Sequence, residues 1–89
     1  MNSEIAPSFL AMFSTLPSDV KALARKNYRL WKHDPAHPSL RFKRVGQRTE
    51  SYSARVGKGW RVVGVKDNDT IIWFWIGSHA DYDKLIPSL

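Results

Sequence analysis

The sequence predicts an α+β fold in which two N-terminal helices pack on an antiparallel, twisted sheet of about four strands. Apolar residues recur at helical spacing up to residue 31, and after residue 39 they alternate with polar residues at a period of two. The 89 residues suffice for one hydrophobic core. We therefore expect residues 1–89 to form a single domain.

The N-terminal third predicts a helical hairpin. Pro7 suits the first position of a helix, and apolar residues follow it at helical spacing as far as Leu16. Pro17 breaks that helix, and Ser18 is the expected N-cap of the next one. An apolar stripe in this second helix consists of Val20, Leu23, Ala24, Tyr28 and Trp31. The other side carries a basic row, which is either a solvated face or the flank of a nucleic-acid surface: Lys21, Arg25, Arg29 and Lys32.

A proline-rich connector, residues 33–39, ends the helical region. His33 and His37 are interpreted as loop residues, because no further ligands stand near them at metal-binding spacing. Four strands are expected after this connector: 40–45, 52–56, 60–66 and 70–77. The fourth is apolar on both faces and is therefore expected at the centre of the sheet.

Two short turns and a final helix complete the predicted fold. Gly57-Lys58-Gly59 predicts a tight hairpin, and Asp67-Asn68-Asp69 predicts a second turn, because these residue types tolerate a left-handed backbone. A short closing helix is expected from Asp81 to Ile86, where Pro87 would end it.

Positive charge is concentrated in the middle of the chain. The formal net charge is +6, and thirteen of the fourteen Lys and Arg residues lie between Lys21 and Lys66, where the only acids are Asp34 and Glu50. Such a field attracts phosphate backbones or an acidic protein. Cysteine is absent and the longest apolar run is far too short to span a membrane, so we expect a soluble, cytoplasmic protein without disulfides. We expect no metal or cofactor.

Alternation along the strands places several cations on one face. Ser53 and Arg55 point away from the apolar residues of their strand, and Arg61 differs in parity from Trp60 and Val62. The predicted patch, on the face away from the helices, consists of Arg41, Lys43, Arg55 and Arg61, with Arg44 and Lys58 as further RNA-binding candidates. Arg61 stands among apolar residues, and a partly enclosed guanidinium requires an anion or a carboxylate.

His79 follows the last strand, and Tyr82 comes one helical turn later. Histidine is the side chain best suited to move protons near neutral pH. The two residues are therefore candidates for one catalytic site. The alternative is that His79 caps the strand end and Tyr82 packs against the sheet.

Several motifs resemble the RelE/ParE superfamily of toxins from type II toxin–antitoxin systems. They are L-x-F-K from Leu40, Y-S-x-R-V from Tyr52, G-W-R-V-V-G from Gly59, D-x-I-I-W-F-W-I-G from Asp69, and S-H-x-x-Y-D from Ser78. The resemblance extends from the Leu-Pro break to the C-terminus. It implies a twisted antiparallel sheet on two N-terminal helices, and an antitoxin partner that is acidic and folds on binding.

The resemblance also implies roles for individual residues. RelE-like members cleave messenger RNA in the ribosomal A site, and ParE-like members inhibit DNA gyrase. On the RelE pattern, Arg61 would hold the scissile phosphate with Arg55, and His79 would transfer a proton without any metal. Tyr82 would lie beside them or stack on a base, and Lys43 would orient the RNA.

The sequence departs from the RelE pattern in three places. Ser53 stands where RelE-type enzymes commonly have a lysine, Asn2–Ile5 is too short to show the usual first strand, and the His-x-x-Tyr spacing differs. Three functions remain open on these residues. They are a ribosome-dependent endoribonuclease, a gyrase inhibitor without nuclease activity, and a degenerate module that only binds its antitoxin.

Overall fold

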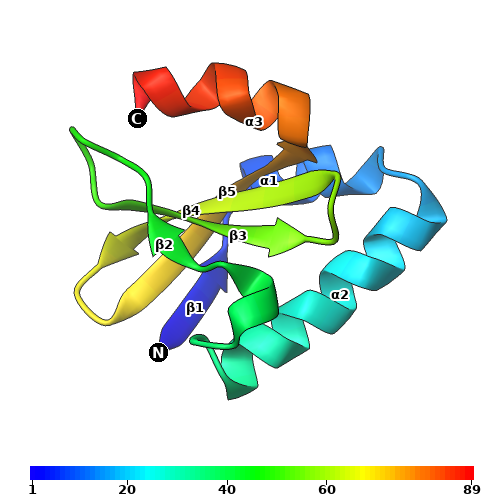
Figure 1. The fold of residues 1–89 in the computed structure, drawn as a ribbon, viewed down its shortest axis with the longest axis horizontal. Coiled ribbons are helices and arrows are strands. Elements are labelled where there is room, and N and C mark those ends of the chain that lie inside the picture. Colours follow the sequence, from blue (N-terminus) through cyan, green and yellow to red (C-terminus); the bar gives the residue numbers. More distant parts are fainter.

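Five strands form one mixed sheet in the computed structural model, which describes all of residues 1–89 (Figure 1). The strands are β1 (Asn2–Ile5), β2 (Lys43–Arg44), β3 (Ser51–Val56), β4 (Trp60–Asp67) and β5 (Thr70–Ser78), and their order in the sheet is β1-β5-β4-β3-β2. Strands β2 to β5 form the predicted antiparallel meander. The predicted fold class is confirmed, with one additional strand.

The additional strand is β1, which pairs in parallel with β5 from Asn2 opposite Thr70 to Ile5 opposite Trp73. Its four residues are too few for the sequence pattern to identify. Because β1 takes the edge, β5 is an interior strand paired on both sides, as its two apolar faces predict, although β4 and not β5 is the middle strand of the five.

The first strand of the meander is shorter than predicted. Pro38–Leu40 forms a 3₁₀ turn, and Arg41 has the left-handed φ of 45° as the chain leaves it. Only Lys43–Arg44 then pairs with β3. Both predicted tight turns are present, with Gly57 at φ 64° in the β3–β4 hairpin and Asn68 at φ 55° in the β4–β5 hairpin.

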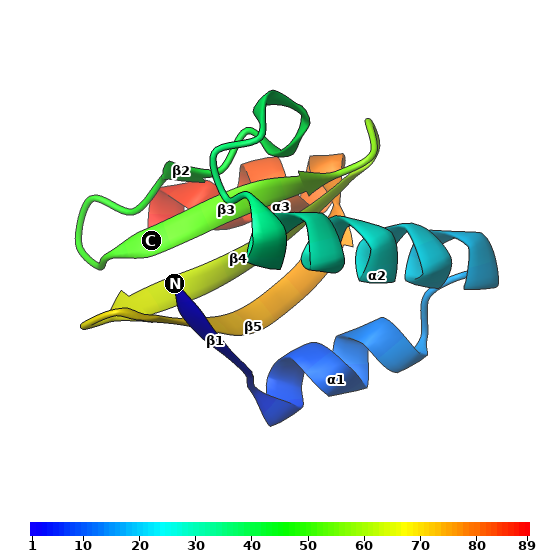
Figure 2. The same ribbon diagram turned by 90° about the horizontal axis from the view of Figure 1, so that it is seen from below.

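Helices cover both faces of the sheet. One face carries α1 (Pro7–Ser14) and α2 (Ser18–His33), and the opposite face carries α3 (His79–Leu85), as Figure 2 shows. Pro7 begins α1 as predicted, but Pro17 and not Ser18 is the N-cap of α2. None of the helices has the length and apolar character needed to cross a membrane.

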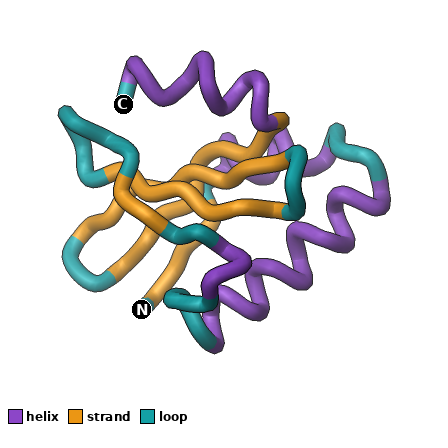
Figure 3. Tube along the Cα trace, viewed as in Figure 1, coloured by secondary structure: helices purple, strands orange, loops and turns teal.

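The closing helix begins earlier than predicted, because the Ser78 hydroxyl caps it by accepting a hydrogen bond of 3.2 Å from the Asp81 N–H. A 3₁₀ turn, Ile86–Ser88, follows α3. The last residue then lies beside the long β2–β3 loop (Figure 3), where the Leu89 carbonyl oxygen accepts hydrogen bonds from the Arg48 and Thr49 backbone N–H groups. The C-terminal segment therefore passes over the sheet face to which the sequence assigns the cationic patch.

The main core lies between the sheet and the first two helices. Trp31 and Trp73 meet edge to face with their ring centroids 5.2 Å apart, and Leu40 is buried beside them. In contrast, α1 has no buried residue, and Leu10 on it is 56% exposed. An apolar pocket of about 170 Å³ therefore remains between α1, α2 and the sheet.

Candidate functional site at the β3–β4 hairpin

Arg55 and Arg61 occupy paired positions on β3 and β4. Paired residues of an antiparallel sheet project to the same face. Since Ala54 and Val56 on either side of Arg55 are buried on the helical-hairpin side, both arginines project toward the α3 side. The structure thus confirms the parity expected for these two residues.

Neither arginine has a carboxylate partner within 4 Å. Arg61 donates hydrogen bonds from Nη1 to the carbonyl oxygens of Trp60 (2.8 Å) and Lys58 (3.2 Å), which fix its guanidinium against the hairpin. Arg55 Nε is buried and has no hydrogen-bond partner. A buried, unpaired donor next to a second cation favours the binding of an anion.

The electrostatic environment of Arg61 agrees with that geometry. Burial lowers the pKa of Arg61, and the neighbouring positive charge of Arg55 lowers it further, with a smaller effect from Arg41. Tyr82 and Asp83 act in the opposite direction. Arginine is protonated at neutral pH even with a lowered pKa. The direction of the shift therefore indicates that the positive charge of Arg61 lies in an unfavourable environment.

Tyr82 packs beneath this arginine pair. Its hydroxyl donates a hydrogen bond of 2.8 Å to Ser53 Oγ, the Arg61 guanidinium carbon lies 5.9 Å from its ring centroid, and it is only 5% exposed. The ring of Trp75 lies near it as well, with centroids 6.4 Å apart. The expectation that Tyr82 stacks on an RNA base does not fit this conformation, because the ring is buried.

His79 is the first residue of α3 and lies beside the same hairpin. Its backbone N–H donates a hydrogen bond of 2.8 Å to the Gly59 carbonyl oxygen. Its side chain is 50% exposed, with Nδ1 at 3.4 Å from Asp83 Oδ2 and the ring centroid 6.2 Å from that of Tyr82. The structure therefore brings His79, Arg55, Arg61 and Tyr82 together at one end of the sheet.

The four RNA-binding candidates are distributed over both faces. Lys43 pairs with Ser53 and so projects to the face of Arg55, whereas Arg44 pairs with Tyr52 and projects to the opposite face. Arg44 also donates from Nε to the Gly46 carbonyl oxygen at 3.3 Å. The structure thus separates Arg44 from the predicted patch.

The other two candidates lie near the arginine pair. Lys58 is exposed in the hairpin turn, and its carbonyl oxygen accepts one of the Arg61 hydrogen bonds. Arg41 is exposed and close enough for its charge to lower the pKa of Arg61. Three arginines and Lys58 therefore contribute positive potential at this end of the sheet.

Two residues of this site received no role from the sequence. Ser53 accepts the Tyr82 hydrogen bond, a contact between residues 29 positions apart that no local pattern indicates. Asp83 lies beside His79, and its spacing of four residues within a helix was a signal that could have identified it.

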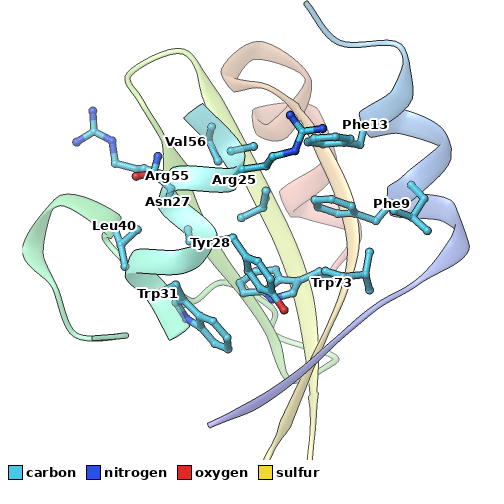
Figure 4. Close-up of a pocket in the computed structure, with 15 residues that line it drawn as sticks. Phe9, Phe13, Arg25, Asn27, Tyr28, Trp31, Leu40, Arg55, Val56 and Trp73 are labelled. Carbon is cyan, nitrogen blue, oxygen red and sulfur yellow. The ribbon is translucent and has the colours of Figure 1, made fainter. Parts of the chain in front are cut away.

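The apolar pocket lies on the other face of the sheet (Figure 4). Phe9 and Phe13 line it from α1, Tyr28 and Trp31 from α2, and Trp73 from β5. Two cations of the basic row lie against rings that line the pocket, with the Arg25 guanidinium carbon 5.2 Å from the Phe13 ring centroid and Lys32 Nζ 5.4 Å from that of Tyr28. The pocket therefore combines an apolar floor with a basic rim.

Three solved structures share this fold at low sequence identity. The archaeal RelE–RelB complex from Pyrococcus horikoshii OT3 matches with a TM-score of 0.68 and 13% identity over 86% of this chain and 92% of that one. The RelB–RelE antitoxin–toxin complex from Methanococcus jannaschii matches with a TM-score of 0.73 and 16% identity over 94% and 99%. A copper-bound mutant toxin from Helicobacter pylori matches with a TM-score of 0.59 and 17% identity over 91% and 97%.

The family assignment comes from the sequence. No curated protein is significantly similar to the chain. The family model described as the ParE-like toxin domain, however, matches residues 18–84, which include α2, strands β2 to β5 and most of α3. The protein thus belongs to the ParE-like toxin domain family, within the RelE/ParE superfamily of toxins.

Proposed function

We propose that the protein is the toxin of a type II toxin–antitoxin system and that it cleaves messenger RNA on the ribosome. The observation that carries this proposal is the pairing of Arg55 with Arg61, without a carboxylate partner for either, next to a half-exposed His79. Such an arrangement stabilises a phosphate that gains negative charge, and it supplies a group able to transfer a proton.

In the proposed reaction the ribose 2′-OH attacks the adjacent phosphorus. The 2′ proton passes to solvent, the new bond between the 2′ oxygen and phosphorus forms, and the bond from phosphorus to the 5′ oxygen breaks. The guanidinium groups of Arg55 and Arg61 stabilise the added charge on the phosphate oxygens. Protonated His79 donates from Nε2 to the leaving 5′ oxygen, giving a 2′,3′-cyclic phosphate and a free 5′-OH.

The remaining candidate residues have supporting roles in this proposal. Arg41, Lys43 and Lys58 bind the RNA backbone by charge. Tyr82 holds Arg61 against the hairpin, because its buried ring lies under the guanidinium and its hydroxyl is anchored on Ser53. Its role is therefore to position a cation and not to contact the RNA.

We further propose that an acidic antitoxin neutralises the protein. Two of the similar structures are complexes of RelE with RelB, and this chain has thirteen Lys and Arg residues between positions 21 and 66. The pocket between α1 and α2 gives such a partner an apolar anchoring point with a basic rim. An acidic segment with large apolar side chains fits that combination.

The test of the nuclease function compares variants during induced expression. Primer extension on cellular mRNA is expected to show new 5′ ends with the wild-type chain and none with Arg61→Ala or His79→Ala. Lys26→Ala is the matched control, because Lys26 is exposed on α2 outside the basic row. Growth arrest by Arg61→Ala and His79→Ala as strong as that of the wild type would contradict the proposal.

The second candidate function is inhibition of DNA gyrase, which the match to the ParE-like toxin domain favours. The presence of Ser53 in place of a lysine also reduces the number of cations at the site. A supercoiling assay with purified gyrase distinguishes the two functions. Inhibition that survives Arg61→Ala, without any mRNA cleavage, would establish the gyrase alternative.

A further inference from the structure

The side chains of His79 and Asp83 form the one acid–base pair within 4 Å in the whole molecule. Every lysine and arginine lacks such a carboxylate partner, so the acid is placed beside the histidine and not beside any of fourteen permanent cations. Asp83 is also the only carboxylate whose charge shifts the pKa of Arg61, which it raises. It therefore belongs to the proposed reaction centre.

The position of this pair is fixed by contacts on three sides. Residues 79 and 83 are one turn apart on α3, and helix geometry places them on one face. The backbone bond from His79 to Gly59 ties the start of the helix to the β3–β4 hairpin. The hydrogen bond of Tyr82 to Ser53 fixes the rotation of the helix. The carboxylate consequently has a defined place relative to both His79 and Arg61.

We propose that Asp83 is the positioning residue for His79, an inference that rests on the nuclease function proposed above. Asp83 Oδ2 lies 3.4 Å from Nδ1, so its negative charge favours a proton on that nitrogen and leaves Nε2 for the substrate. The carboxylate also stabilises the imidazolium that must donate to the leaving 5′ oxygen. Asp83 itself gains no proton and contacts no RNA.

The pair does not serve stability. Both side chains are at least half exposed, and exposed ion pairs contribute little to folding. Asp83→Asn should therefore leave the melting temperature unchanged while it impairs proton donation. This separation between stability and activity makes the inference testable without loss of the fold.

The experiment uses ribosome-bound mRNA with either a normal phosphodiester or a 5′-phosphorothiolate at the mapped cleavage site. On the normal substrate, Asp83→Asn should lower kcat by about tenfold or more with KM unchanged, as expected for loss of an orienting partner. Asp83→Glu should recover part of kcat. On the 5′-thio substrate the defect should disappear, because a thiolate leaves without being protonated.

The matched control is Asp81→Asn, since Asp81 is exposed on the same helix and has no basic partner within 4 Å. Wild-type rates for Asp83→Asn on the normal substrate would overturn the inference, as would an equal defect on both substrates or a defect confined to KM. Absence of cleavage by the wild-type chain would overturn the proposed nuclease itself, which is a different result from normal cleavage by Asp83→Asn.

Discussion

Arg55 and Arg61 face each other across two hydrogen-bonded strands, and no carboxylate lies within 4 Å of either guanidinium. Two like charges at paired positions destabilise a sheet. Their presence at a partly buried location implies that the folded protein tolerates an unfavourable contact that an incoming phosphate would relieve.

Replacement of Arg61 by glutamine should separate stability from activity. The rate of mRNA cleavage should fall by about 10²–10³-fold, as expected when a donor to a developing anion is lost. The free energy of unfolding, measured with urea at low salt, should equal or exceed that of the wild type. The lowered pKa of Arg61 means that its charged form disfavours folding. This destabilisation by the charged Arg61 is fully present at neutral pH. It is relieved only in strongly alkaline solution, where the guanidinium loses its proton in the folded state before it does so in the unfolded state.

The same variant also has a result that would contradict this explanation. If the free energy of unfolding of Arg61→Gln fell below that of the wild type by more than about 1 kcal/mol, the Arg61 hydrogen bonds to Trp60 and Lys58 would outweigh the repulsion from Arg55.

Polyvalent anions should stabilise the wild-type protein. At the same ionic strength, pyrophosphate should raise the melting temperature more than chloride does, because only an anion that binds the folded state adds stability by mass action. The increment should be lost in Arg55→Gln and kept in Arg29→Gln, whose exposed side chain lies on α2. An identical response of these two variants would show that pyrophosphate binds elsewhere.

Removal of the Tyr82 hydroxyl should affect stability more than activity. Tyr82→Phe keeps the ring under Arg61 but loses the hydrogen bond to Ser53, which should cost about 0.5–1.5 kcal/mol. In a double-mutant cycle with Ser53→Ala, the two losses should be clearly less than additive, because each variant breaks the same bond. A loss of mRNA cleavage in Tyr82→Phe at full stability would instead assign the hydroxyl a direct part in the reaction.

Gly57→Ala should destabilise the hairpin that carries the site. Gly57 has a left-handed φ of 64°, and a Cβ there would lie 2.7 Å from Leu23 Cδ2. These two effects should together cost about 1–3 kcal/mol, measured by urea unfolding. Gly59→Ala is the control in the same turn, since its added Cβ would have no atom within 4 Å. Equal losses for both variants would show that neither the backbone conformation nor Leu23 restricts position 57.

The sequence predicted that Arg55 and Arg61 share one face, because both differ in parity from the apolar residues of their strands. It left the strand register open, and the structure supplies the direct pairing of the two residues. The sequence could not predict that the two tryptophans on β5 lie on opposite faces of the sheet. Alternation places Trp73 and Trp75 on one face, but the register shifts between Val63 and Gly64. Trp73 therefore packs in the core under α2, whereas Trp75 contacts Tyr82 on the other face.

The remaining differences arise from contacts that are distant in sequence. The pairing of β1 with β5 joins residues 68 positions apart, and four residues are too few to show a period. The position of α3 over the arginine face depends on the Tyr82–Ser53 contact, which has no local signature. The cations, the histidine and the closing helix were therefore identifiable from the sequence, whereas the position of that helix over the arginine face was not.

Because of the Ser53–Tyr82 hydrogen bond, substitutions at position 53 on β3 and at position 82 on the C-terminal helix α3 depend on each other. A lysine at position 53 would bring a charge under a buried ring, in a place where the serine is 2% exposed. Such a change would expel Tyr82 and remove the support of Arg61. A lineage that adds or removes a cation at position 53 must therefore alter position 82 as well, and relatives of this toxin should show paired, not single, changes at these two positions.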